Sequence, residues 1–388
     1  NGPNPQFAPL GAYHPFDGDA MVHAVYLDDG AARYRNRWIE SKGLLAERER
    51  GHACYGGMSN MVIPEPDVIQ EAGFLKNTSN THTIRHAGRY FGLLEAGKPT
   101  ELSRELDTIG EWDFDGKLKG PMTAHPKIDP VTGDLVFFGY SAQVPYLRYH
   151  EADADGTLVH SVDLDLPAPI MMHDFAVTEH YVVFFDSPAV FDLDALLSGG
   201  DALQWKPENG TRIGVLPRRG TADQIRWFEA DNCYIVHFFN AWDTVADPGA
   251  GDTITVTAPR MPDRPGGFEF VDPGAAREPM PWRWTIDLDR GTVSETQTDD
   301  LPGEFPRVND NVAGRRNRYG YNCMQRTWAF EFDFHGVVKY DNDTGDSFTH
   351  YYADTEVSGE HSFAPDPDGS AEDDGWLLSF VSDKTTRE

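Results

Sequence analysis

Apolar and polar residues alternate along much of the chain, in short runs separated by turns of Asp and Gly. Five such units are VYLDDGAARYRNRW (25–38), KIDPVTGDLVFFGY (127–140), YHEADADGTLVHSVDL (149–164), WTIDLDRGTVSET (284–296) and KYDNDTGDSFTHYY (339–352). Alternation with a period of two predicts half-buried strands, and Asp and Gly tolerate the positive φ that tight hairpins need. The pattern therefore predicts a succession of antiparallel hairpins.

The same pattern predicts an all-β fold with little helix. Only SRELDTIG (103–110) and LDALLSGG (193–200) are predicted as short helical turns. Many short hairpins at irregular spacing are typical of a sandwich, a barrel or a propeller, and a length of 388 residues favours the propeller among the three. The stretch 246–279, rich in Pro, Gly and Asp, is interpreted as a long excursion that carries a strand, because the hairpin pattern resumes after it.

Composition narrows the class of protein. Hydrophobic residues make up 39% of the chain and aromatic residues 12%, which indicates a globular protein. The formal net charge of −30 disfavours a nucleic-acid partner, since phosphates would be repelled. No apolar run approaches the roughly 18 residues of a membrane span. Cys54, Cys233 and Cys323 form neither a zinc spacing nor a disulfide framework, so a cytoplasmic location is expected.

Both ends of the chain have the character of cut ends. The chain begins at Asn1 without an initiator methionine, and it ends in SDKTTRE directly after an apolar strand. We therefore expect a propeller truncated at both ends.

Three of the fourteen histidines are candidates for a shared site. His125 directly precedes a proline in MTAHPKIDPVTG, His173 opens a strand in PIMMHDFAVTEHYVVFFDSP, and His237 lies within DNCYIVHFFNAWD on one face with Ile235 and Phe239. A histidine in an apolar stretch is usually a hydrogen-bonded core residue. A propeller, however, brings strand starts together, and imidazole suits iron, copper, nickel and zinc. Spacing alone leaves both interpretations open.

Several long motifs carry a resemblance to a known family. NGPNPQF, YHPFDGDAMVHAVY, MTAHPKIDP, MMHDFAVTEHYVVFFD, GEFPRVND, RYGY and AEDDGWLLSFV closely resemble the carotenoid cleavage oxygenases, which include stilbene-cleaving dioxygenases and the vertebrate retinoid isomerohydrolase. The motifs run in the family's order over residues 1–388. The resemblance implies a single seven-bladed β-propeller domain over 1–388, apparently truncated at both ends and lacking its C-terminal closing segment.

The resemblance also implies a non-haem Fe(II) held by four histidines. Three of them carry over to this chain, as His125, His173 and His237. Family members place glutamates behind the ligands, and the motifs LLEAGKP, GEFPR and SGEHSFAP put these at Glu95, Glu304 and Glu360. The fourth family histidine lies in a GFHG-like motif after EDDGW, beyond the end of this chain. His335 in DFHGVVKYD imitates that motif too early in the sequence, so it is not expected to bind iron. His14 and His23 match an early motif that is structural in the family.

The implied reaction inserts both atoms of O₂ across one carbon–carbon double bond and gives two carbonyl products. The expected substrate is a small apolar conjugated molecule, a carotenoid or apocarotenoid, with a lignostilbene-type stilbene as the alternative. Stilbene-cleaving members have a lysine near the LLEAG segment, whereas here Leu93 and Leu94 precede Glu95 and Lys98 follows it, which favours the carotenoid. Transient contact with a membrane surface is plausible for such a substrate, and no obligate protein partner is evident. The alternative from another functional class is a non-catalytic truncated propeller that lacks its fourth iron ligand. Because only three ligands would remain, such a chain is expected to be iron-poor.

Overall fold

The computed structural model describes residues 1–11, 14–57, 62–192, 195, 202–245, 251–262, 278–326 and 333–386. The fold is all-β with few helices, as predicted. The chain divides into two compact units, one of residues Asn1–Pro126 and Asp134–Asp165, the other of Lys127–Gly133 and Leu166–Glu388.

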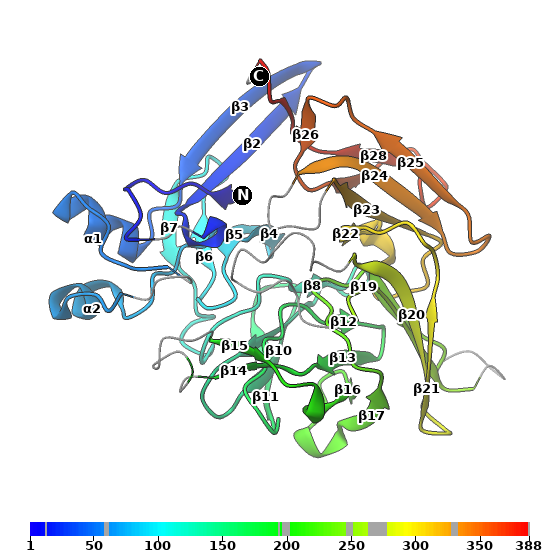
Figure 1. The fold of residues 1–388 in the computed structure, drawn as a ribbon. Helices are drawn as coiled ribbons and strands as arrows, with labels where there is room; N and C mark the ends of the chain where they lie inside the picture. The colour runs from blue at the N-terminus through cyan, green and yellow to red at the C-terminus, as the bar shows by residue number, and fades with distance from the viewer. Residues whose placement is uncertain are drawn as a thin grey trace. The chain divides into compact units, whose positions relative to one another are not determined.

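The first unit opens with a three-stranded antiparallel sheet of β1 (Gly2–Pro3), β2 (Ala20–Asp28) and β3 (Ala31–Trp38). The hairpin of β2 and β3, drawn in blue, is the first of the predicted units (Figure 1). Its turn places Asp29 at φ 46° and Gly30 at φ 75°. Positive φ at both central residues matches the right-handed twist of the two strands, so the sequence pattern and the turn agree.

Two helices of the first unit were not predicted. They are α1 (Lys42–Arg50) and α2 (Pro66–Ala72), and a single 3₁₀ turn, η1 (Pro15–Asp17), precedes β2. The Oγ of Ser41 accepts a hydrogen bond from the Leu44 amide at 3.2 Å, and Gly51 ends α1 at φ 76°. A serine before a helix and a glycine after it are standard start and stop signals, so this part of the pattern was missed rather than absent.

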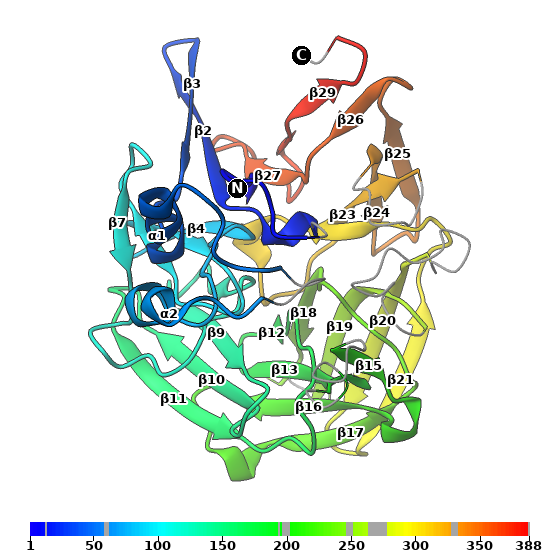
Figure 2. The ribbon, with the colours of Figure 1, turned by 60° about the vertical axis from the view of Figure 1, so that its left-hand side comes forward.

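Two further sheets complete the first unit. Their strands are β4 (His82–His86), β5 (Arg89–Leu93), β6 (Thr100–Leu102) and β7 (Thr108–Glu111), then β9 (Leu135–Tyr140), β10 (Leu147–Ala152) and β11 (Leu158–Leu164). Each set pairs antiparallel in chain order, and β10 and β11 lie side by side in Figure 2. Phe91, Phe114 and Phe137 belong to one buried cluster with residues of both sheets.

The helical turn predicted for 103–110 is wrong. The Oγ of Ser103 accepts the amides of Glu105 at 3.2 Å and Asp107 at 3.0 Å, and Leu106 lies at φ 66°. A serine side chain that bonds its own following amides offers the backbone an alternative to a helix, and here the chain turns and continues as β7. The second predicted helical turn, 193–200, falls outside the described residues apart from Ala195.

The second unit begins with β8 (Lys127–Ile128) and contains two four-stranded antiparallel sheets. One consists of β12 (Ala176–Val177), β13 (Tyr181–Asp186), β16 (Thr211–Pro217) and β17 (Arg226–Ala230), the other of β18 (Asn240–Asp243), β19 (Thr253–Arg260), β20 (Met280–Asp287) and β21 (Thr292–Gln297). Strand β19 is the strand expected within 246–279; residues 246–250 and 263–277 of that stretch lie outside the described residues. Phe185, Phe238 and Trp284 pack in one buried cluster that joins the two sheets.

The last sheet and two ribbons complete the second unit. The sheet contains β22 (Glu304–Arg307), β23 (Tyr319–Gln325), β24 (Phe334–Asp341), β25 (Ser347–Tyr351), β26 (Glu356–Ser358) and β29 (Val381–Asp383). The ribbons are β14 (Ala189–Phe191) with β15 (Leu203–Trp205), and β27 (Ser362–Pro365) with β28 (Gly375–Leu378). Three 3₁₀ turns are η2 (Pro207–Asn209), η3 (Ala222–Gln224) and η4 (Asp310–Val312).

Burial explains why these stretches form sheets of this kind. In β13 the run Val182 to Phe185 is buried at every position, so this inner strand is covered on both faces. In the outer strand β11, by contrast, exposed and partly buried residues alternate between two buried ends. Antiparallel sheets with apolar inner strands and half-polar outer strands are typical of β-propeller blades, and the described residues form six such sheets of three or more strands.

Candidate metal centre

His125 lies in the short irregular segment that leads into β8. Its backbone amide donates to the Oγ1 of Thr123 at 3.0 Å, and the Thr123 amide donates to the carbonyl of Phe138 in β9 at 2.7 Å. The ring of His82 stacks on the ring of His125 with 6.0 Å between centroids and 27° between planes. The histidine is therefore held through its backbone by a neighbouring strand and through its ring by an aromatic contact.

His173 lies in an extended segment just before β12. The segment is fastened two residues earlier, where the Met171 amide donates to the Ala189 carbonyl at 2.8 Å. His237 lies just before β18, between an isolated bridge that joins Tyr234 to Met261 and the first residue of that strand. The strand predicted across DNCYIVHFFNAWD thus begins later than expected, at Asn240, because the preceding residues pair at one point only.

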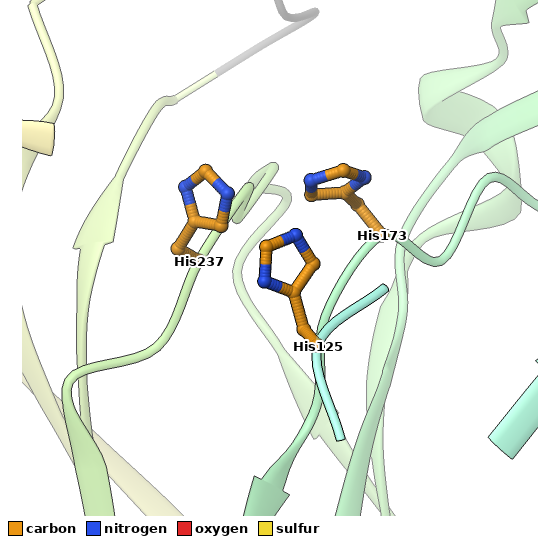
Figure 3. Close-up of side chains that lie close together, drawn as sticks. All are labelled: His125, His173 and His237. Atoms are coloured by element: carbon orange, nitrogen blue, oxygen red, sulfur yellow. The ribbon is translucent and has the colours of Figure 1, made fainter. Parts of the chain in front are cut away.

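The structure brings the three predicted histidines together. Each offers one ring nitrogen, and these three atoms all lie within 4.8 Å of one another. The rings face a common point in Figure 3, and the centroids of His173 and His237 lie 5.0 Å apart at an interplanar angle of 71°. His237 is 8% exposed, and the other two are partly buried. Three convergent imidazoles with limited access to water are a donor set that suits a transition metal.

Glu304 lies beside one of these rings. Its Oε2 lies 2.7 Å from the Nδ1 of His237, both side chains are buried, and the same oxygen also accepts the Phe305 amide. A carboxylate at Nδ1 fixes the proton there, so Nε2 is the nitrogen that a metal would take. The other oxygen, Oε1, is buried with no hydrogen-bond partner among the described residues. Phe305 holds a positive φ of 57°, and its ring lies 5.0 Å from that of His237.

The other two glutamates are placed differently. Glu360 is half-exposed, and its carboxylate pairs with the Nη2 of Arg307 at 3.2 Å. Glu95 is partly buried and lies two residues beyond the end of β5. A role for Glu95 and Glu360 behind a metal ligand therefore stays a prediction.

Three further histidines have partners of their own. His335 lies in β24 with its ring stacked on Tyr351 at 5.6 Å, and it is not part of the three-histidine group. His14 accepts the Phe16 amide at Nδ1 and caps η1, in agreement with a structural role. His361 contacts Cys323 Sγ through Nδ1 at 3.0 Å and the Tyr352 hydroxyl through Nε2 at 2.7 Å.

The buried cysteines lie outside the three-histidine group. Burial raises the pKa of the Cys233 thiol to about 12, and it raises the pKa of the Cys323 thiol to about 12 as well. Among the described residues, the candidate group thus consists of imidazole nitrogens.

Sequence reasoning missed the side chains that fasten the ligand-bearing segments. Asp174 accepts hydrogen bonds from Lys127 Nζ at 2.8 Å, the Phe175 amide at 2.8 Å and the Phe238 amide at 2.9 Å. Asn240 donates to the carbonyls of Val312 and Arg315 at 3.1 and 2.7 Å. The feature of the sequence that could have indicated this role is the aspartate directly after His173, because it is a charged residue in an otherwise apolar run.

Comparison with known proteins identifies the family to which the chain belongs. The sequence profile described as "Retinal pigment epithelial membrane protein" (RPE65) matches residues 1–388. The chain belongs to the RPE65/carotenoid cleavage oxygenase family. Among its curated relatives in the family, "Carotenoid 9,10(9',10')-cleavage dioxygenase 1" of Phaseolus vulgaris is 32% identical over 99% of this chain and 76% of its own length. "Isoeugenol monooxygenase" of Pseudomonas nitroreducens is 33% identical over 98% of this chain and 82% of its own length.

Solved structures of family members have a fold similar to that of this chain. The lignostilbene dioxygenase of Pseudomonas brassicacearum superimposes with a TM-score of 0.88 at 31% identity, covering 100% of this chain and 83% of its own. Cobalt-substituted Synechocystis ACO, an apocarotenoid oxygenase, gives a TM-score of 0.83 at 28% identity over 96% of this chain and 81% of its own. Among the described residues, no helix is both long and apolar enough to cross a membrane.

Proposed function

We propose that this chain catalyses the Fe(II)-dependent cleavage of one carbon–carbon double bond in a carotenoid or apocarotenoid by O₂, giving two carbonyl products. The observation that carries the proposal is the convergence of His125, His173 and His237, whose ring nitrogens lie within 4.8 Å of one another. Family membership supplies the reaction class, because the named relatives are oxygenases.

The residues present fit an iron ion. Imidazole is a good ligand for iron, and the buried carboxylate of Glu304 at Nδ1 of His237 orients the ring and raises its basicity. When bound, Fe(II) would supply the activation of dioxygen. His125, His173 and His237 would hold the ion, and Glu304 would keep the Nδ1 proton of His237 in place so that Nε2 faces the metal. A cobalt-substituted relative with a similar fold supports metal binding without choosing the native metal.

The substrate class rests on the surroundings of Glu95. Leu93 is fully buried, and the nearest lysine along the chain, Lys98, pairs with Asp113 at 3.3 Å. The apolar side chain at this position and the pairing of Lys98 with an aspartate both favour a polyene without a phenol. The likeness to a lignostilbene dioxygenase and to an isoeugenol monooxygenase supports the alternative of a phenolic stilbene or phenylpropene.

The test is metal-dependent turnover. The chain, loaded with Fe(II) without oxygen, is expected to bleach an apocarotenoid on admission of O₂ and to place ¹⁸O from ¹⁸O₂ in both products. A stilbene and isoeugenol, run in parallel, decide the substrate class by kcat/KM. Bleaching that is equally fast without added metal, or in a His173→Ala variant, would reject the proposal. A chain that folds but turns over none of the substrates would support the non-catalytic alternative.

Glu304→Gln sharpens this test. The substitution keeps the shape of the side chain but removes the negative charge from the Nδ1 side of His237, so iron affinity should fall about 10- to 100-fold. Glu295→Gln is the matched control, since Glu295 also accepts two hydrogen bonds, from the Asp231 amide and from Trp284 Nε1. Equal iron affinity in the two variants would contradict the role of Glu304.

The proposal also covers the domain organisation, the number of blades, and the location and partners of the protein. We propose that residues 1–388 form one oxygenase-type domain, because the family profile spans both compact units. Seven blades, as in the sequence-based expectation, and a cytoplasmic location with no obligate protein partner stay predictions. Support for the blades comes from the six antiparallel sheets of the described residues.

A further inference from the structure

One carboxylate joins the segments that carry two of the candidate ligands. Asp174 directly follows His173, and its Oδ2 accepts the amide of Phe238, which directly follows His237, at 2.9 Å. The two segments lead into strands of different sheets, β12 and β18, so no strand ladder aligns them. The spacing between the two histidine backbones therefore depends on side-chain bonds of this kind.

The second oxygen of Asp174 is equally engaged. Oδ1 accepts a hydrogen bond from Lys127 Nζ at 2.8 Å and one from the Phe175 amide at 2.8 Å. Lys127 lies two residues beyond His125 in the chain, and its ammonium also lies 5.9 Å from the centre of the Phe175 ring. One carboxylate thus binds three donors, all on residues one or two positions from a candidate ligand or directly beside Asp174.

Burial makes these bonds obligatory. The Asp174 side chain is 2% exposed, so its charge has lost nearly all contact with water. A buried carboxylate is tolerated only when its oxygens are hydrogen-bonded and a counter-charge is near. A buried N–H donor that lost this carboxylate would in turn lack an acceptor, which costs free energy of folding. The position of the carboxylate is thus tightly fixed, and with it the backbone at His173 and at Phe238.

We propose that Asp174 is a positioning residue of the metal centre, which holds the His173 and His237 segments at the spacing that lets both rings reach one ion. The inference rests on the proposed metal-binding function and deepens it. Two of its hydrogen bonds go to backbone amides, those of Phe175 and Phe238, so Asp174 acts through the backbone on either side. Lys127 places a positive charge 2.8 Å from the carboxylate and helps to hold it in place.

The experiment measures Co(II) binding by competition with a chromophoric chelator, together with the visible absorption bands of the bound ion. Asp174→Ala removes every bond and should weaken Co(II) binding by at least about tenfold, with an altered spectrum, as is typical when groups behind metal ligands are lost. Asp174→Asn keeps an oxygen that can accept the Phe238 amide, so it should restore part of the affinity. Lys127→Met keeps the apolar stem without the charge and should also weaken binding.

Asp186→Asn is the matched control. Asp186 is likewise a buried carboxylate, with its side chain 8% exposed, and pairs with Arg212 Nε at 2.7 Å in the sheet that contains β12. It joins no ligand segment. Its substitution should lower the melting temperature as Asp174→Asn does while leaving Co(II) affinity and spectrum at the values of the unmodified chain.

The outcomes separate this inference from the proposed function. If the unmodified chain takes up no Co(II), metal binding itself fails and the role of Asp174 fails with it. If the unmodified chain binds Co(II) but folded Asp174→Ala binds it with the same affinity and spectrum, only the role of Asp174 is overturned. Should Asp174→Ala not fold, Asp174→Asn and Lys127→Met decide, and unchanged affinity in both would overturn the inference.

Discussion

At the scale of single residues, two buried histidines differ in the hydrogen-bond partners of their ring nitrogens. His237 has a carboxylate oxygen of Glu304 2.7 Å from Nδ1. His150 has only the Ser161 hydroxyl at Nδ1, stacks on Phe137 at 4.9 Å, and its Nε2 is buried with no hydrogen-bond partner among the described residues. A carboxylate stabilises positive charge at a ring, whether from a metal or a proton, whereas an apolar surrounding favours the neutral ring. The first histidine is thus suited to a site and the second to a core.

His150 should make the stability of the protein fall in mild acid. Burial lowers the pKa of His150 from 6.5 to about 3. Near pH 7 neither the folded nor the unfolded state holds the proton, so the group contributes nothing. As the pH falls below about 6.5, the unfolded chain binds a proton that the folded chain refuses, and unfolding gains about 2 kcal/mol by pH 5. Denaturant unfolding at pH 7 and pH 5 should show this loss, and His150→Gln should remove it.

His52→Gln is the control for this prediction. His52 lies exposed at the surface, whereas His150 is buried, and the substitution of His52 should leave the difference in stability between pH 7 and pH 5 unchanged. If His150→Gln lost as much stability between the two pH values as the unmodified chain, protonation of His150 would not be the cause.

At the scale of elements, the candidate ligands lie at strand starts and not within strands. His125 precedes β8, His173 precedes β12 and His237 precedes β18. Irregular backbone there leaves amides unpaired by a ladder, and side chains such as Asp174 and Thr123 take those amides instead.

The β2–β3 hairpin offers a clean test of one element. Gly30 lies at φ +75°, and a Cβ added there would meet nothing within 4 Å, so the only cost of Gly30→Ala is the left-handed backbone. That cost should be about 1–2 kcal/mol in the free energy of unfolding. Gly2→Ala is the control in the same sheet, because a Cβ there also meets nothing within 4 Å and its φ is not positive. Equal stabilities of the two variants would contradict the turn geometry.

Such turns also show which parts of the fold could be predicted from the sequence. Hairpins whose strands alternate around Asp-Gly turns were predictable, because strand period and turn chemistry are both local: 25–38, 149–164, 284–296 and 339–352 each form one. The convergence of His125, His173 and His237 was expected only from a resemblance, because distant segments meet through tertiary packing. The bonds of Asp174 were not predictable, since nothing in the residue itself says which distant amide it accepts. Helix α1 was missed although Ser41 and Gly51 mark its ends.

At the scale of the whole molecule, charge is the dominant feature of composition. Asp and Glu number 63 against 33 Lys and Arg, which gives the formal net charge of −30. Many acidic side chains at the surface nonetheless form ion pairs: Asp107 pairs with Arg37 at 3.2 Å, and Glu105 pairs with Arg33 at 3.6 Å. Exposed pairs contribute only about 0–1 kcal/mol each, and they do not cancel the surplus of acid. Repulsion among the unbalanced carboxylates should therefore oppose the folded state.

Added salt should then stabilise this protein. At an ionic strength of 0.1 M the Debye length is about 10 Å, short enough to screen carboxylates on separate elements but not the partners of a close ion pair. We expect the melting temperature to rise from low salt to moderate NaCl at pH 7, by about 1 °C for each kcal/mol that screening adds to a chain of this length. Potassium chloride at equal ionic strength should give the same rise, because screening depends on ionic strength and not on the identity of the cation. A melting temperature that falls with salt would instead mean that attraction within the surface ion pairs outweighs repulsion among the surplus carboxylates.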